Sequence, residues 1–142
     1  MLEITNITNE KIDAKPLQKA AKAAFAVLAR RSSAKRNEGG GEESISLVFT
    51  CDARMRGINK KFRGQDKTTD VLSFEELNEI YICLPQAWRQ AKADKIPIEE
   101  ELMRLLIHGI VHLKGYDHER SVKEAERMFA VEKKILKKLN GR

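Results

Sequence analysis

Four segments of the chain carry the pattern of hydrophobic and polar residues that is typical of β-strands. MLEITNIT, at the amino terminus, and SISLVFT, at 44–50, alternate apolar and polar positions over part of their length. VLSF at 71–74 and EIYIC at 79–83 are short apolar runs, each of which follows a turn-rich or acidic loop. We therefore expect a small four-stranded sheet.

Apolar residues at helical spacing fill most of the remaining chain and predict about five helices. Three of them are expected to begin near Asp13, Met55 and Pro85. A fourth follows Pro97, where an acidic first turn leads into LMRLLIHGIVHLK, which is apolar on nearly all sides and is expected to be the central, buried helix. A capping box of Ser121 and Glu124 predicts the last helix. The residues of this helix that we expect to face the core are Ala125, Met128, Phe129, Leu136 and Leu139.

Helices and a small mixed sheet in one pair of layers predict an α+β fold, with residues 1–142 forming a single domain. A length of 142 residues and a hydrophobic content of 42% fit one globular domain that needs neither a metal nor a disulfide in order to fold. Cys51 and Cys83 form no CxxC motif and are expected to be buried free thiols in a reducing cytoplasm. We expect no signal peptide, because the first residues show no basic start followed by an apolar run, and no apolar run reaches the roughly 20 residues needed to cross a bilayer, so a membrane location is not expected.

The charge of the chain favours a polyanionic partner. The formal net charge is +6, from 27 basic and 21 acidic residues, an excess that many proteins without such a partner share. The arrangement is more informative, because four basic residues crowd one short segment. They are Lys60, Lys61, Arg63 and Lys67.

All three histidines lie in one window, HGIVHLKGYDH at 108–118. His108 and His112 are four positions apart on the predicted central helix, so both rings can reach one ion from the same face. Gly115 allows the chain to leave the helix in a left-handed conformation, so that His118 can turn back towards the ion. Three histidine ligands leave a position open for water, which is typical of a catalytic site. We expect one divalent metal ion, with zinc first and nickel, copper and iron also compatible.

The same spacing occurs in the HExxHxxGxxH metalloproteases, but Gly109 stands where those enzymes carry the glutamate that acts as general base. Glycine inside a helix costs about 1 kcal/mol relative to alanine, so we expect the close approach of another backbone or of substrate at this position. A zinc-bound water with a pKa lowered to about 7 needs little help to ionise. Such a site can still hydrolyse a substrate whose transition state is stabilised by other groups.

The window HGIVHLKGYDH, preceded upstream by INKKFRGQDKTTDVLSF, resembles the YbeY-type endoribonucleases. These are bacterial metal-dependent enzymes linked to the maturation and quality control of ribosomal RNA. The resemblance covers most of the chain from Leu47 onward and implies a small mixed sheet packed with helices around a central metal-bearing helix. The sequence departs from the family pattern at Asn78 and Glu79, where a Gly-Asp pair is usual.

The resemblance also implies roles for individual residues. It implies His108, His112 and His118 as metal ligands, and it implies Arg63 as the basic residue needed for RNA cleavage. A guanidinium can hold a phosphodiester through two hydrogen bonds and neutralise charge in the transition state. The residues expected to bind flanking phosphates are Lys60, Lys61 and Lys67, and those expected to fix the loop are Asn59 and Asp70.

These observations predict a metal-dependent endoribonuclease that cleaves single-stranded RNA in the cytoplasm. Ribosomal RNA is the expected substrate, and the small ribosomal subunit is a candidate partner. Two alternatives stay open, namely a zinc metallopeptidase, against which Gly109 argues, and a non-catalytic ribosome-associated module that binds RNA and holds a structural metal. The attacking group is also open, because either water or the ribose 2′-hydroxyl fits the site.

Overall fold

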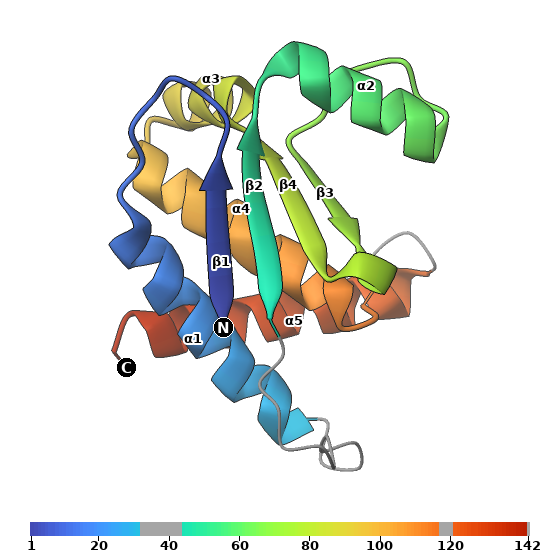
Figure 1. The fold of residues 1–142 in the computed structure, drawn as a ribbon. Coiled ribbons are helices and arrows are strands. Elements are labelled where there is room, and N and C mark those ends of the chain that lie inside the picture. The colour runs from blue at the N-terminus through green and yellow to red at the C-terminus, as the bar shows by residue number, and fades with distance from the viewer. Residues whose placement is uncertain (32–43, 117–120, 142) are drawn as a thin grey trace.

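A four-stranded mixed sheet forms the centre of the computed structural model, which describes residues 1–31, 44–116 and 121–141 (Figure 1). The strands are β1 (Leu2–Asn6), β2 (Ile45–Thr50), β3 (Val71–Phe74) and β4 (Glu79–Cys83). Their order in the sheet is β1-β2-β4-β3. β2 runs parallel to both β1 and β4, whereas β3 pairs antiparallel with β4 and ends the sheet on one side. All four strands lie where the hydropathy pattern predicts them.

The described residues form five α-helices around this sheet. They are α1 (Ala14–Arg31), α2 (Asp52–Arg63), α3 (Leu84–Asp94), α4 (Ile98–Leu113) and α5 (Val122–Leu139). α4 packs against β3 and β4 on one face of the sheet, and α1 and α5 pack beside it (Figure 1). α2 and α3 begin where β2 and β4 end. The predicted α+β fold, with a mixed four-stranded sheet and five helices, is confirmed.

Alternation along the strands decides which face of the sheet is buried. In β2, Ile45, Leu47 and Phe49 are fully buried and point to the helices, whereas Ser46 and Val48 between them are only half-buried. Side chains at every second position lie on the same face of a strand. The pairing of β2 with β4 and of β4 with β3 places Tyr81, Leu72 and Phe74 on the same face as Val48. Of the described helices, only α2 contacts this second face, where Phe62 meets Phe74.

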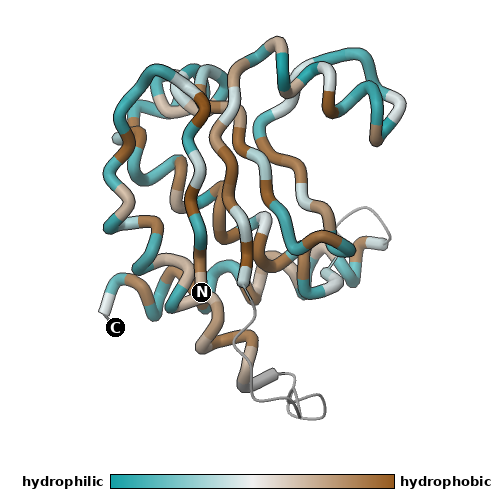
Figure 2. Tube along the Cα trace, viewed as in Figure 1, coloured by the Kyte–Doolittle hydropathy of each residue, from teal (hydrophilic) through white to brown (hydrophobic). Residues whose placement is uncertain are grey.

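The core lies between the inner face of the sheet and three helices. α4 supplies large apolar side chains that are buried on most sides of its axis, as predicted for a central helix. Ala20, Ala21 and Ala24 of α1 are fully buried, and their small side chains allow α1 to approach α4 closely. Figure 2 shows hydrophobic residues gathered along the central strands and α4. No helix of the described residues is both long enough and apolar enough to span a bilayer.

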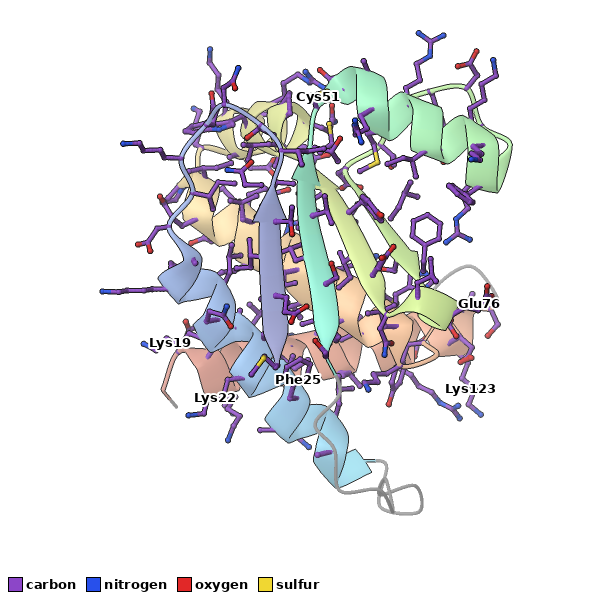
Figure 3. The ribbon with its side chains drawn as sticks, in the orientation of Figure 1. Lys19, Lys22, Phe25, Cys51, Glu76 and Lys123 are labelled. Atoms are coloured by element: carbon purple, nitrogen blue, oxygen red, sulfur yellow. The ribbon has the colours of Figure 1, made fainter. Side chains whose placement is uncertain are left out.

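Two predictions about burial are wrong. Phe129 and Leu136 of α5, expected in the core, are 64% and 37% exposed, because the buried face of α5 is formed by Met128, Val131 and Ile135. Met128 is the one fully buried residue of the predicted set. Cys51, expected to be buried, is exposed, because it lies where β2 ends and α2 begins (Figure 3).

Asn78 explains how the chain turns from β3 into β4. A short 3-10 segment, Glu75–Leu77, follows β3, and Asn78 then adopts a left-handed conformation with φ of 51°. Asparagine tolerates this region better than most residues with a side chain. Asn78 therefore fulfils at this turn the conformational role for which glycine is usual in the family pattern.

Candidate active site

Two of the three histidines lie on one face of α4. His108 and His112 are both half-buried, and their ring centroids are 6.1 Å apart. After the helix, Gly115 has a φ of 95°, the positive value that we expect where the chain leaves the helix. His118 lies outside the described residues. Within the described residues, no group of three or more metal-binding side chains is found.

Glu132 of α5 holds the first of these histidines. Its Oε2 lies 2.8 Å from Nδ1 of His108, and the side chains of His108 and Glu132 are only 29% and 21% exposed. Val131, the residue before Glu132, is fully buried in the core and fixes α5 beside α4. A carboxylate at one ring nitrogen sets the orientation of a histidine and directs its other nitrogen towards an ion.

An ion pair between the exposed Arg104 and a buried carboxylate lies on the same side of α4, closer to its amino end. The Glu101 carboxylate is fully buried, and its Oε2 accepts hydrogen bonds of 2.6 Å from Arg104 Nη2 and from Gln90 Nε2 of α3. The hydrogen bond with Glu101 raises the pKa of Arg104, and the charges of Asp70 and Glu132 contribute in the same direction. The positive charge of Arg104 on α4 therefore lies within the electrostatic influence of three carboxylates, of Glu101, Asp70 and Glu132, and the last of these also contacts His108.

Gly109 faces the sheet. Gly109 is buried, and a Cβ atom placed on it would lie 3.0 Å from Cγ2 of Ile80 and 3.2 Å from Oγ of Ser73. The Ser73 hydroxyl donates a 3.1 Å hydrogen bond to the carbonyl oxygen of Gly109. The close approach at this glycine is made by side chains of β3 and β4, and not by the backbone or substrate expected there from the sequence. A glutamate here would have no room between α4 and the sheet.

Arg63 reaches the same part of the molecule from α2. It is the last residue of that helix, and Gly64 ends the helix in a left-handed conformation with φ of 70°. Arg63 Nη2 donates a 2.7 Å hydrogen bond to the carbonyl oxygen of Ser73, and its guanidinium carbon lies 5.2 Å from the centre of the Phe74 ring. Arginine has five N–H donors in a planar fork, so this contact leaves donors that can bind a phosphate.

Ser73 connects the two halves of the candidate site. Its carbonyl oxygen accepts from Arg63, and its hydroxyl donates to Gly109, the residue directly after His108. The structure therefore brings Arg63 and the histidine-bearing part of α4 to opposite sides of one strand residue.

The predicted RNA-binding lysines surround the end of α2. Lys60, Lys61 and Lys67 are all exposed. Lys60 Nζ lies 4.0 Å from a carboxylate oxygen of Asp66, and Lys61 Nζ lies 5.4 Å from the centre of the Phe62 ring. Asn59 fixes the loop that carries Lys67, as predicted, because Nδ2 of this buried residue donates a 2.8 Å hydrogen bond to the Lys67 carbonyl oxygen.

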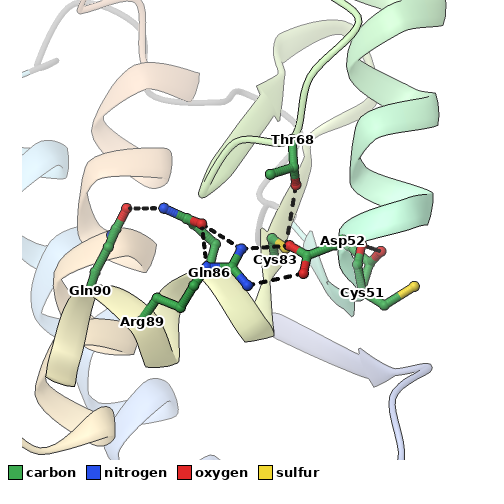
Figure 4. Close-up of polar contacts among 8 residues, drawn as sticks. Cys51, Asp52, Thr68, Cys83, Gln86, Arg89 and Gln90 are labelled. Carbon is green, nitrogen blue, oxygen red and sulfur yellow. Dashed lines mark hydrogen bonds and ion pairs between the residues drawn. The ribbon is translucent and has the colours of Figure 1, made fainter. Parts of the chain in front are cut away.

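A polar cluster fixes the other end of α2 (Figure 4). Asp52, in the first turn of α2, accepts two hydrogen bonds from Arg89 of α3, at 2.7 and 3.1 Å, and a third from the Cys83 thiol at 3.2 Å. The hydrogen bond from Arg89 holds the pKa of Asp52 below its usual value of 3.8. Burial raises the pKa of the Cys83 thiol, which therefore stays protonated at neutral pH. The cluster joins α2 to α3 and so orients the helix that ends at Arg63.

Sequence reasoning missed two residues that organise this site. Ser73 stands within an apolar strand, and Glu132 stands within a helix rich in charged residues. Each contacts α4 from another element, at separations of 36 and 24 residues along the chain. The only local signal is the hydroxyl of Ser73 on the inner face of β3, where an apolar side chain is usual.

Comparison with known proteins shows the class of enzyme to which the chain belongs. The family model described as "Endoribonuclease YbeY" matches residues 3–140. The chain is thus an endoribonuclease, a hydrolase that acts on phosphodiester bonds of RNA. More particularly, it belongs to the endoribonuclease YbeY family.

Similar proteins support the same assignment. The chain is 45% identical over 108 residues to the endoribonuclease YbeY of Persephonella marina, a match that covers 68% of this chain and 71% of that protein. It is also 45% identical over 105 residues to the endoribonuclease YbeY of a Sulfurihydrogenibium species, over 67% of this chain and 69% of that protein. The solution structure of TM1509 from Thermotoga maritima has a TM-score of 0.66 and 29% identity, and covers 99% of this chain and 90% of that one.

Proposed function

We propose that this protein is a metal-dependent endoribonuclease that cleaves single-stranded RNA, with residues 1–142 acting as one catalytic domain. We further propose that its substrate is ribosomal RNA, which it cleaves during maturation and ribosome quality control in the cytoplasm, with the small ribosomal subunit as partner. The observation that carries the proposal is the double contact of Ser73. It ties a cationic side chain, Arg63, to the part of α4 that carries His108 and His112.

The donor set fits a divalent ion, with zinc as the first choice. His108 and His112 present two imidazoles from one helical face, and His118 is proposed as the third ligand. With its Nδ1 at the Glu132 carboxylate, His108 would bind the ion through Nε2. When bound, such an ion supplies Lewis acidity at a phosphoryl oxygen and makes water easier to ionise.

Arg63 is proposed as the catalytic side chain of the protein itself. Its hydrogen bond to Ser73 and its packing on Phe74 hold the guanidinium plane before substrate arrives. A preorganised cation stabilises the negative charge that develops on the phosphorus oxygens in the transition state. The exposed amino groups of Lys60, Lys61 and Lys67 are proposed to bind the neighbouring phosphates.

The position of Gly109 supports a nuclease over a metallopeptidase. The glutamate of the HExxHxxGxxH proteases acts from this position, but here the position is filled by Ile80 and Ser73. Phosphodiester cleavage depends less on a dedicated carboxylate base, because its transition state is stabilised chiefly by cations and metal ions. The residues around Gly109 therefore suit phosphodiester cleavage better than peptide hydrolysis.

The test is the cleavage of an end-labelled single-stranded RNA by zinc-loaded protein. Chelator treatment and the change Arg63→Ala are each expected to abolish cleavage. Arg127→Ala is the matched control, because Arg127 is an exposed arginine of α5 that makes no hydrogen bond or ion pair with another described residue. Arg127→Ala protein is expected to cleave at the wild-type rate.

Two outcomes contradict the proposal. Cleavage that persists in Arg63→Ala or His112→Ala protein would mean that a contaminating nuclease is responsible. Metal-loaded protein that binds RNA without cleaving it would favour the non-catalytic module. A DNA strand of the same sequence, run in parallel, bears on the attacking group: cleavage of both strands indicates water, because DNA has no 2′-hydroxyl, whereas cleavage of RNA alone is consistent with attack by the 2′-hydroxyl.

A further inference from the structure

Three aromatic rings form a continuous row beside Arg63. Phe62, at the end of α2, and Phe74, at the end of β3, have ring centroids 5.4 Å apart at an interplanar angle of 69°. Phe74 and Tyr81 of β4 follow at 5.7 Å and 85°. These are edge-to-face contacts, in which each ring fixes the orientation of the next. The row begins at the end of α2 and continues onto the face of the sheet that carries Phe74 and Tyr81, opposite the face covered by α4.

Phe62 is the exposed end of this row. It is 58% exposed, whereas Phe74 and Tyr81 behind it are half-buried. Lys61 and Arg63, its neighbours in sequence, each bring a cation to an aromatic ring, at 5.4 Å from Phe62 and 5.2 Å from Phe74 respectively. Phe62 thus presents an apolar ring to solvent directly beside the cation that is proposed to bind a phosphate.

The ring is held in place before any ligand binds. Gly64 ends α2 two residues after Phe62, and the following loop is tied back by Asn59 and by the 2.7 Å ion pair of Arg56 with Asp66. A fixed aromatic ring loses little conformational entropy when a flat ligand stacks on it. The apolar surface of Phe62 is therefore preorganised.

We propose that Phe62 is a base-stacking subsite for one unpaired nucleotide of the RNA strand whose phosphate Arg63 binds. The inference rests on the proposed function for its RNA substrate. Every base has a flat face that can stack on an aromatic ring, and a neighbouring cation attracts the attached phosphate. Bases within a duplex are already stacked and paired, so such a subsite selects single-stranded RNA.

Charge complementarity limits where the strand can run. The α2 side of Phe62 carries Lys60 and Lys61, whereas the segment after Phe74 carries Glu75 and Glu76, both exposed. Phosphates are attracted to the first group and repelled by the second. The strand therefore follows the end of α2 from Arg63 to Phe62 and avoids the 3-10 segment.

The test measures the binding of metal-free protein to fluorescent single-stranded RNA, so that no cleavage occurs during the titration. Each protein is titrated with intact RNA and with RNA in which the bases are removed but every phosphate is kept. The variants are Phe62→Leu, which keeps an apolar side chain without a ring, and Phe62→Tyr, which keeps the ring. Phe129→Leu is the matched control, because Phe129 is 64% exposed and has Lys133 5.6 Å from its ring centre, on α5.

The wild type is expected to bind intact RNA about tenfold more tightly than base-free RNA, which corresponds to ~1.4 kcal/mol. Phe62→Leu should lose this preference, while its affinity for base-free RNA and the salt dependence of binding stay unchanged, because the phosphate contacts remain. Phe62→Tyr and Phe129→Leu should keep the preference.

Equal binding of intact and base-free RNA by the wild type would overturn the inference, and this comparison needs no variant to fold. A Phe62→Leu protein that keeps the base preference, or a Phe129→Leu protein that loses it, would overturn it as well. Failure of the proposed function gives a different result: a protein that binds with a base preference but cleaves nothing keeps the subsite and refutes the catalysis.

Discussion

Replacing Gly57 and Gly109 by alanine separates the two effects that a glycine has inside a helix. Gly57 lies within α2 and Gly109 within α4, so each alanine gains about 1 kcal/mol of helix propensity. A Cβ at Gly57 meets nothing within 4 Å. A Cβ at Gly109 lies 3.0 and 3.1 Å from two carbons of Ile80 and 3.2 Å from the Ser73 hydroxyl.

The neighbours of Gly109 have little room to move. Ile80 is fully buried on β4, which lies between β2 and β3. Overpacking of such a site costs about 1–3 kcal/mol, and displacement of the Ser73 hydroxyl from the Gly109 carbonyl costs about 0.5–1.5 kcal/mol more. After the gain in helix propensity, Gly109→Ala is expected to destabilise the fold by about 0.5–3.5 kcal/mol. Gly57→Ala is expected to stabilise it by up to about 1 kcal/mol.

Urea unfolding of metal-free protein, followed by far-ultraviolet circular dichroism, measures both free energies of unfolding. The difference between the two variants is the informative quantity, because the helix propensity cancels from it. We expect a difference of about 1.5–4.5 kcal/mol, or at least about 3 °C in Tm. Equal gains in stability at the two positions would refute the claim that Gly109 exists to let α4 contact the sheet.

Two further predictions concern charged contacts. Arg89→Met should destabilise the fold only slightly at pH 7, because the side chains of Arg89 and Asp52 are 52% and 45% exposed and solvent screens their attraction. Since Arg89 lowers the pKa of Asp52, this stabilisation is present above the ordinary value of 3.8 and is lost as the pH falls through the lowered pKa, so urea unfolding of both proteins should show the gap closing in acid. Glu132→Ala should weaken zinc binding about 10- to 100-fold in competition with a chromophoric chelator, because His108 loses its orienting carboxylate. An unchanged zinc affinity would mean that the Glu132 contact has no bearing on the metal site.

The sequence predicts the fold well because most helices and strands have a hydrophobic repeat that can be recognised within the element itself. Strand alternation and the apolar surface of α4 are local patterns, and each is found in the structure at the expected place. The buried face of α5 is different. Its apolar residues permit two neighbouring faces, and contact with α1 and α4 selects the one with Met128, Val131 and Ile135. Phe129 and Leu136 are therefore exposed.

The candidate site likewise has features that the local sequence predicts and features that depend on how distant elements pack together. The spacing of His108 and His112 is a property of one helix, and it is readable without any knowledge of what surrounds that helix. The contacts of Ser73 and Glu132 depend on how β3 and α5 pack against α4, which no local spacing determines. The basic cluster is intermediate: its location is evident in the sequence, but the distinction between Lys60, which approaches Asp66, and Arg63, which binds Ser73, requires the structure.

The place of β3 in the sheet explains why Arg63 and α4 can meet. β3 is the last strand in the order, so one of its two sides faces no other strand of the described sheet. The carbonyl oxygen of Ser73 can then accept a hydrogen bond from Arg63, whereas a carbonyl between two strands would be used by the ladder. The Ser73 side chain points to the helical face instead and reaches Gly109. One residue of an edge strand can therefore hold a cation from α2 and a helix turn from α4 at once, and a residue of β2 or β4 could not.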